Sequence, residues 1–262
     1  MDDYKTLVIY VFHEYNLRVE YFFKNALFYD NNTKFLVICN TLELLYLQKI
    51  KELIPSYVDI LFRDNKGFDF GAWSEGIYTN KNYNNYDYFI FVNSSVIGPF
   101  LPDSQKEKKW TDIFISGLTD NIKLYGPSIA SGEFPSHVQS YLFCMNAFTL
   151  RYLMENEIFT LNKYTDSKEE TIHNKEINMS QLILKIPNWN IGSKMEYYKN
   201  IDFSKNRNEI PIFLFGDAMY IEYMKPSHLD KNLPFSFKKT INTIELWSIE
   251  ELVFIKGNRI IE

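Results

Sequence analysis

TLVIYVF, at residues 6–12, is an unbroken run of apolar and β-branched residues near the start of the 262-residue chain. Such a run is typical of a β-strand that is covered on both faces. Three further runs follow along the chain: KFLVICN (34–40), YVDILFRD (57–64) and DYFIFVNSS (87–95). Together they predict four buried strands of one sheet.

Helix-like segments separate these strands. NLRVEYFFKNALFY (16–29) and LELLYLQKIKELI (42–54) carry apolar residues at helical spacing, and Pro55 ends the second segment. GAWSEGIYTN (71–80) begins a third helix. The order βαβαβαβ predicts an α/β fold with a mostly parallel central sheet and helices on both faces. Ligands of such folds bind beyond the carboxyl ends of the strands, so we expect the chemistry there.

Composition limits the classes of function. A hydrophobic content of 46% can bury a sizeable core, which favours one large domain. The net charge of −5 and the lack of a dense lysine and arginine run disfavour nucleic-acid binding. No signal peptide or membrane-spanning run is evident, and Cys39 and Cys144 lie in apolar stretches that predict buried, reduced thiols. We therefore expect a soluble cytoplasmic protein without an integral membrane segment.

Polar or glycine-bearing residues follow all four predicted strands. They are residues 13–16 (HEYN), 39–41 (CNT), 63–71 and 93–95 (NSS). Each one alone is better explained as a turn or a helix cap than as part of a ligand site, because caps favour Asn, Ser, Thr and Asp. Together they predict one polar rim at the edge of the sheet.

The third strand end is part of DNKGFDFGAW (64–73). Gly67 and Gly71 are expected where the backbone has a positive φ or where another chain segment approaches closely. Asp69 either caps the following helix or accepts hydrogen bonds from sugar hydroxyls, and Arg63 or Lys66 would suit a phosphate. The spacing matches neither the Walker motif nor the dinucleotide-binding glycine motif. These residues predict a ligand with hydroxyl or phosphate groups.

Five blocks together resemble a glycosyltransferase family related to the rhamnan-synthesis proteins, the rhamnan-synthesis-protein-F-like family, with members in bacteria, eukaryotes and giant viruses. The blocks are DNKGFDFGAW (64–73), YDYFIFVNSSVIGPFLP (86–102), PSHVQSYLFCMN (135–146), KEINMSQLIL (175–184) and ELVFIKGNR (251–259). The chain resembles a giant-virus or eukaryotic-type member.

The resemblance implies a GT-A-like fold, in which a Rossmann-like nucleotide-binding half continues into an acceptor-binding half. Residues 1–262 would form one such domain, with residues 1–100 binding a nucleotide sugar and residues 101–262 binding the acceptor. It implies hexosyl transfer from a nucleoside-diphosphate donor to a hydroxyl of a glycan or glycoprotein, with inversion. A UDP-sugar is the first choice of donor and a dTDP-sugar the second.

The resemblance also implies roles for individual residues. Glu176 is expected to be the base that takes the acceptor proton, although a glutamate at a helix start is equally explained by the helix dipole. Asp69 is expected to act in catalysis and donor binding, and His137 is otherwise explained as a core residue. The expected donor-binding residues are His13, Glu14, Asn65, Lys66, Gly67, Asp69, Asn93, Ser94, Ser95, His137, Gln139, Lys256 and Arg259.

The fourth strand end departs from the family pattern. Most GT-A enzymes hold Mn²⁺ or Mg²⁺ with an Asp-x-Asp motif there, whereas this chain has Asn93-Ser94-Ser95. Neutral oxygens bind such ions more weakly than paired carboxylates do. One alternative is a cation held mainly by the diphosphate, with help from residues such as Ser95, His228 or Asp217. The other is neutralisation of the diphosphate by Lys66, Lys256 or Arg259.

Two other classes of protein remain open. A catalytically inactive nucleotide-sugar or glycan-binding module would have the same rim, and the neutral Asn-Ser-Ser segment favours it. A nucleotidyltransferase on a similar core would need acidic metal ligands at the strand ends, where they are scarce.

Overall fold

The computed structural model describes residues 4–131, 134–205 and 249–257. In the first part of the chain it has the order β1 (Thr6–Phe12), α1 (Leu17–Asn25), β2 (Thr33–Cys39), α2 (Leu44–Leu53), β3 (Asp59–Phe62), α3 (Phe68–Tyr78) and β4 (Tyr88–Asn93). This confirms the predicted alternation. Helix α3 begins earlier than predicted, because Phe68 to Phe70 already form its first turn.

The second part is less regular. It contains β5 (Val96–Ile97), α4 (Trp110–Ile115), β6 (Ile122–Gly126), β7 (Ile129–Ala130), β8 (His137–Val138), β9 (Leu142–Asn146), α5 (Ala147–Glu155), α6 (Lys168–Thr171), a π-helical segment (Ile172–Ile177), α7 (Asn178–Leu184), β10 (Asn190–Ser193), α8 (Ile249–Leu252) and β11 (Ile255–Lys256). Short 3₁₀ turns lie at Thr79–Asn84, Asp103–Gln105 and Glu196–Tyr198. Strand β11 lies within the ELVFIKGNR block and follows the end of α8.

Seven strands form the central sheet, in the order β10-β6-β9-β4-β1-β2-β3. Among the described strands of this sheet, β9 runs against its neighbours β4 and β6, and the other pairs are parallel. The predicted α/β class with a mostly parallel sheet is thus confirmed. The chain moves from β1 to β2 and β3 on one side, and places β4 on the other side of β1. Such a change of direction opens a ligand crevice beyond the strand ends.

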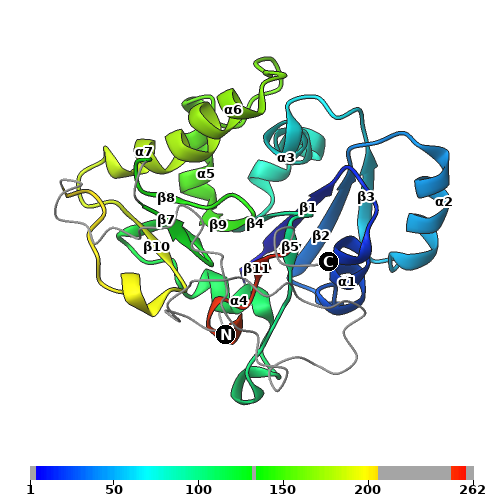
Figure 1. Cartoon of the computed structure of the whole chain (residues 1–262), viewed down its shortest axis with the longest axis horizontal. Helices are drawn as coiled ribbons and strands as arrows, with labels where there is room; N and C mark the ends of the chain where they lie inside the picture. The colour runs from blue at the N-terminus through cyan, green and yellow to red at the C-terminus, as the bar shows by residue number, and fades with distance from the viewer. Residues whose placement is uncertain (1–3, 132–133, 206–248, 258–262) are drawn as a thin grey trace, which may run out of the picture.

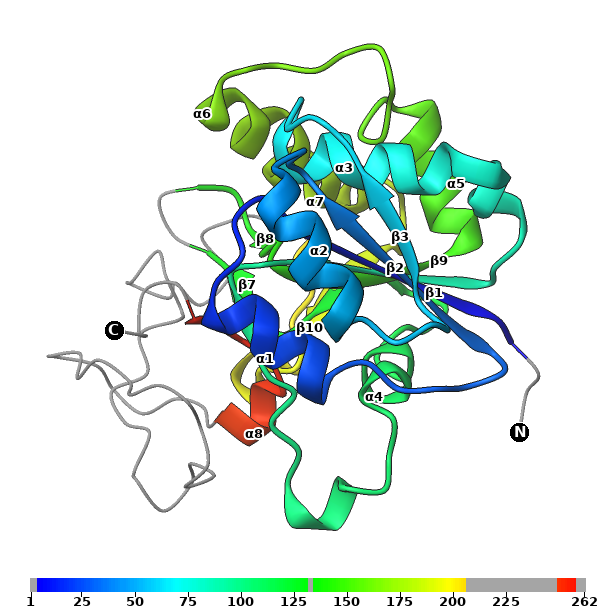
Figure 2. The same ribbon diagram turned by 90° about the vertical axis from the view of Figure 1, so that its right-hand side faces the viewer.

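Helices cover both faces of the sheet (Figures 1 and 2). Helices α3, α5, α6 and α7 lie on one face, whereas α1 and α4 lie on the other. Because the strands are covered on both sides, every residue of β1 is buried. This burial explains why the strand sequences are continuously apolar rather than alternating.

Aromatic residues join α3 to the sheet. Trp73 is fully buried, and its ring packs edge-on against Phe143 of β9 at 5.2 Å between ring centres. Phe143 stacks in turn on Phe91 of β4 at 4.8 Å, and Phe70 contacts both Trp73 and Phe143. Phe70 and Trp73 of DNKGFDFGAW therefore belong to the core, which leaves the polar residues and glycines of this stretch to shape the rim.

Both cysteines are buried and free, as predicted. Among the described residues, no helix combines the length and apolar character needed to cross a bilayer.

Candidate functional site

The polar residues that follow β1 to β4 lie at one edge of the sheet, because the strands end in register. Val11 lies beside Asn93, and Cys39 lies between Phe12 and Phe62. At the first of these ends, His13 and Glu14 are exposed. Asn16 caps α1, since its side-chain oxygen accepts hydrogen bonds from the backbone N–H groups of Arg18 and Val19.

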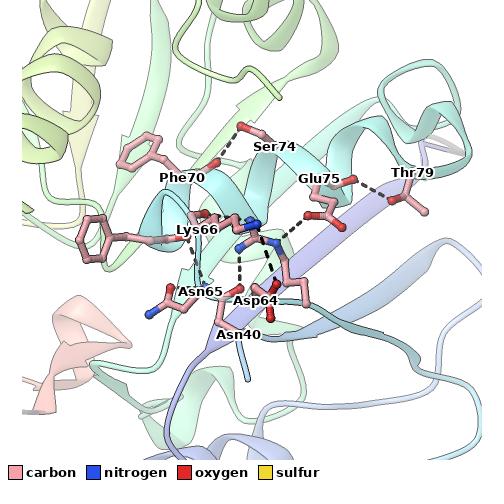
Figure 3. A network of polar contacts seen from close by, with 10 residues as sticks. Asn40, Asp64, Asn65, Lys66, Phe70, Ser74, Glu75 and Thr79 are labelled. Carbon is pink, nitrogen blue, oxygen red and sulfur yellow. Dashed lines mark hydrogen bonds and ion pairs between the residues drawn. The ribbon is translucent and has the colours of Figure 1, made fainter. Parts of the chain in front are cut away.

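Arg63 holds the third strand end together (Figure 3). Its guanidinium donates to Glu75 Oε2 at 2.6 Å, to Asn40 Oδ1 at 2.7 Å and to the Lys66 carbonyl at 2.8 Å. The side chain is buried, so these bonds replace the water that it loses. Each of the three nitrogens is engaged and the side chain is buried, so the structure gives Arg63 a role in shaping the loop.

Gly67 and Gly71 make this tight loop possible. Gly67 has a φ of +69°, which residues with a side chain rarely adopt. The Gly71 N–H donates to the Gly67 carbonyl at 2.8 Å, and a Cβ on Gly71 would lie 2.1 Å from the Lys66 carbonyl oxygen. Both roles expected from the sequence, positive φ and close approach, are confirmed. The side chains of Asn65 and Lys66 are exposed on the outer side of this turn.

Asp69 connects the third strand end to the fourth. It lies within the first turn of α3 and forms no side-chain cap hydrogen bond, so the cap interpretation is wrong. Its Oδ2 atom instead accepts a hydrogen bond from Asn93 Nδ2 at 2.9 Å. Asn93 Oδ1 accepts from the Ser95 backbone N–H at 3.0 Å and also from the Ser95 hydroxyl. We call Asp69, Asn93 and Ser95 the rim triad.

Burial of the Asp69 carboxylate, with a smaller contribution from the negative charge of Glu176, raises its pKa to about 6. The Asn93 hydrogen bond and the positive charge of Lys168 oppose this shift. Two carboxylates therefore interact across the rim although they are more than 100 residues apart in sequence. Such a perturbed pKa beside a cluster of polar groups is typical of a functional site.

We expect Asp69→Asn to stabilise the protein above pH 6 and to have no effect on stability below about pH 4. The folded-state pKa of about 6 exceeds the ordinary value of 3.8, so the folded protein binds the proton more tightly and loses stability as the pH rises between these values. That difference corresponds to a gain of up to about 3 kcal/mol for the asparagine variant at pH 7. Thermal unfolding of both proteins from pH 3.5 to 8 measures it. Equal stability of the two proteins at pH 7 and pH 4 would contradict the assigned environment.

Glu176 lies in the middle of a helix, not at a helix start as the sequence suggested. Helix α6, the π-helical segment and α7 run without a break from Lys168 to Leu184, and Glu176 lies in the π-helical part. Explanation by the helix dipole therefore fails, because that effect is confined to the terminal turns. Glu176 Oε1 accepts a hydrogen bond from the Ser140 N–H at 2.8 Å. π-Helical turns within α-helices are frequent at functional sites.

Lys256 reaches the same region from the far end of the chain. Strand β11 pairs with β5 directly after the rim triad, and places Lys256 opposite Val96. Burial lowers the pKa of the Lys256 ammonium, the Glu176 carboxylate raises it, and Lys168 lowers it. Lys256 and Glu176 are therefore electrostatic neighbours at the rim.

His137 and Gln139 have structural partners. His137 is buried, and its Nδ1 atom donates to the Pro135 carbonyl at 2.8 Å. Gln139 Oε1 accepts from the Ser128 hydroxyl at 2.7 Å. The second bond joins the residue before β7 to the residue after β8, and the core interpretation of His137 agrees with its burial. Arg259, His228 and Asp217 lie outside the described residues.

Arg18 and Tyr10 are two residues of this region that the sequence analysis missed. Arg18 Nε donates to the Ser94 carbonyl at 3.1 Å. Tyr10 is fully buried with no hydrogen-bond partner for its hydroxyl among the described residues, and it interacts electrostatically with Arg18 and Asp69. Tyr10 resembles any apolar strand residue in the sequence. Arg18 could have been noticed in the sequence, because a cation in the first turn of a helix is disfavoured by the helix dipole.

A groove of about 580 Å³ lies elsewhere, between β6, β10 and residues 198–204. Its lining includes Tyr125, Trp189 and Asn190 and none of the residues predicted for the site. Asn190 Oδ1 already accepts hydrogen bonds from the Ile191 and Phe203 N–H groups. Size alone therefore does not identify the functional site.

A family model described as "Rhamnan synthesis protein F" matches residues 35–208, about two thirds of the chain. The chain belongs to this family. The match to the rhamnan synthesis protein F family contains DNKGFDFGAW, the rim triad and Glu176. No curated protein matches the chain in sequence.

Solved structures give weaker similarities to this family member. The glycosyltransferase GlyE from Streptococcus pneumoniae TIGR4 is 13% identical, covering 75% of this chain and 46% of its own, with a TM-score of 0.42. A 4-diphosphocytidyl-2C-methyl-D-erythritol synthase from Anaerococcus prevotii is 7% identical over 79% and 93% of the chains, with a TM-score of 0.44. Mannosyltransferase PcManGT from Pyrobaculum calidifontis, in complex with GDP-Man and Mn²⁺, is 8% identical over 57% and 46%, with a TM-score of 0.38.

The chain spans less than half the length of GlyE and of PcManGT. Scores of this size do not decide between glycosyl and nucleotidyl transfer. Membership of the rhamnan synthesis protein F family rests on the sequence match.

The rim of this rhamnan synthesis protein F family member does not fit a divalent cation held by protein ligands. Asn93 Oδ1 accepts two hydrogen bonds from Ser95, which engage both of its lone pairs. One oxygen of Asp69 and one of Glu176 are also engaged. The described part of the chain has no group of three or more His, Cys, Asp or Glu side chains placed to hold a metal. Of the expected metal ligands, the Ser95 hydroxyl donates to Asn93, and His228 lies outside the described residues.

Proposed function

We propose that this protein transfers a sugar from a nucleoside-diphosphate donor to a hydroxyl group of a glycan or glycoprotein acceptor. The observation that carries the proposal is the hydrogen-bonded rim triad at the end of β4, close enough to Glu176 for the two carboxylates to interact. It lies next to β1, where the connections of the sheet change direction. Membership of the rhamnan synthesis family supports a role in glycan synthesis.

We assign a role in donor binding to the residues that follow β1 and to those at the start of α3. Asp69 accepts hydrogen bonds from hydroxyls of the donor, since its second carboxylate oxygen has no protein partner in the described residues. His13 and Glu14, which are exposed at the end of β1, contact the base or ribose. Residues 1–100 form the donor half and residues 101–262 the acceptor half of one GT-A-like domain.

Glu176 is proposed as the general base of an inverting reaction. The acceptor oxygen attacks the anomeric carbon, its proton passes to Glu176, and the bond to the diphosphate breaks with its electron pair on the leaving oxygen. The Ser140 N–H orients the carboxylate through Oε1. Oε2 has no partner in the described residues and is the atom we assign to the proton.

The finer assignments stay predictions. The transferred group is predicted to be a hexosyl group, and the donor nucleotide to be UDP before dTDP. The protein is predicted to be a giant-virus or eukaryotic-type member that acts in the cytoplasm.

A donor panel tests the proposed function. Purified protein is incubated with UDP-, dTDP- and GDP-sugars, and both thermal shift and nucleoside-diphosphate release are measured. We expect slow release from at least one donor. Asp69→Asn should weaken binding of that donor about 10- to 100-fold, because a charged acceptor is lost. Because this variant is expected to be more stable than the original protein, weaker donor binding could not be explained by unfolding.

Other outcomes would identify other functions. Donor binding without release, also with candidate acceptors present, would favour the inactive binding module. Release of pyrophosphate from a nucleoside triphosphate and a sugar phosphate would indicate a nucleotidyltransferase. No binding of any donor would refute the proposed function.

A further inference from the structure

Two cations that have no acidic partner among the described residues flank the loop after β4. Arg18 uses only its Nε atom, which donates to the Ser94 carbonyl. Its two terminal nitrogens have no hydrogen-bond or ion-pair partner among residues 4–131, 134–205 and 249–257. Within the same residues the Lys256 ammonium has no such partner either. Arg18 approaches the loop from α1, and Lys256 approaches it from β11.

Both side chains are partly buried. Burial lowers the pKa of Arg18 and of Lys256, which shows that each charged group has lost part of its water. Glu14 stabilises the positive charge of Arg18, and Glu176 that of Lys256, by electrostatic attraction over a longer distance. Among the described residues, neither cation forms an ion pair with a carboxylate. Partly desolvated cations without a partner cost free energy. An anionic ligand would supply the missing partner.

The loop between these cations is held from both sides. The Gly257 N–H donates to the Ser95 carbonyl at 2.6 Å, next to Lys256, and Arg18 binds the neighbouring Ser94 carbonyl. Arg18 and the residue after Lys256 therefore bind consecutive carbonyl groups of this loop.

An independent observation comes from Tyr10 below the loop. Its hydroxyl is fully buried and unpartnered in the described part of the chain, and it interacts electrostatically with Arg18 and Asp69. Buried hydroxyls normally have a partner, so Tyr10 is a further polar group near Arg18 that the described residues leave unsatisfied.

We propose that Arg18 and Lys256 bind the diphosphate group of a nucleoside diphosphate, and that this binding requires no divalent cation held by the protein. The inference rests on the proposed function and specifies how its donor is bound. A guanidinium whose two terminal nitrogens have no partner in the described residues matches the oxygens of a phosphate, and a lysine ammonium adds a compact second charge. The engaged oxygens of the rim triad agree with this assignment, since they leave few ligands for a metal ion.

Isothermal titration with UDP, dTDP and GDP tests the inference. Each nucleotide is titrated into the whole protein with EDTA and then with Mn²⁺. The variants are Arg18→Gln and Lys256→Gln, with Arg18→Lys and Lys256→Arg as charge-preserving versions. Arg151→Gln and Lys185→Gln are matched controls, because both side chains are exposed and outside the rim. Circular dichroism confirms that each variant is folded.

We expect at least one nucleotide to bind in EDTA, with Mn²⁺ changing the affinity less than about threefold. Each glutamine variant should lose about 10- to 100-fold in affinity. The charge-preserving variants should lose less, and the controls should bind like the original protein. Binding that appears only with Mn²⁺, or glutamine variants that bind normally, would overturn the inference and leave the proposed function intact. Absence of binding under every condition would refute both.

Discussion

Replacement of Glu176 by glutamine is expected to lower the rate of sugar transfer by about 10²- to 10⁴-fold, the range typical of a lost general base. The glutamine side chain is nearly the same size and can still accept the Ser140 hydrogen bond with its oxygen. It cannot take a proton from the acceptor. Affinity for the nucleoside diphosphate should therefore change less than about threefold, while kcat falls.

Glu169→Gln is the matched control for this variant. Glu169 lies in the first turn of the same helix and is exposed. We expect it to transfer sugar at the original rate. Equal rates for Glu176→Gln and the original protein would show that Glu176 is not the base.

Gly71→Ala is expected to destabilise the protein by about 3 kcal/mol or to prevent folding, which is near the upper end of overpacking effects. The new methyl group would lie 2.1 Å from the Lys66 carbonyl oxygen. Because that contact is with backbone, relief requires movement of the 63–71 loop. The movement would break the Arg63 network and shift Asp69 away from Asn93. Urea unfolding measures the change in free energy.

Gly76→Ala provides the comparison, because Gly76 lies further along the same helix. A Cβ there would meet the side-chain ends of Ile38 at 2.9 Å and Leu36 at 3.1 Å. Side-chain ends move more easily than backbone, so we expect a loss of about 1 kcal/mol or less. If Gly71→Ala is as stable as Gly76→Ala, the 63–71 loop is not as tightly constrained as the contacts indicate.

The sequence predicted the fold well where one pattern had one explanation. Runs such as residues 6–12 and 87–95 are apolar on both faces, and this is possible only for strands covered on both sides. The second half was harder to predict. The block at residues 135–146 contains two strands, β8 and β9, which belong to different sheets. Long-range pairing decides that division, and local sequence does not record it.

The site was predictable in outline but not in its contacts. The glycines and Asp69 of DNKGFDFGAW were recognisable because few other roles need that composition. Arg63 was misjudged, since its partners Asn40 and Glu75 are 23 and 12 residues away in sequence. Glu176 was misplaced at a helix start, because the helix that contains it begins in a polar segment with little helical periodicity.

A crystal structure of the protein with the nucleotide sugar that gives the largest thermal shift tests the central claim most directly. We predict that the diphosphate lies over residues 93–95, in contact with Arg18 and Lys256, and that a donor hydroxyl binds the Asp69 carboxylate. A donor bound in the groove lined by Tyr125 and Trp189, with the rim triad unoccupied, would contradict the assignment of the site.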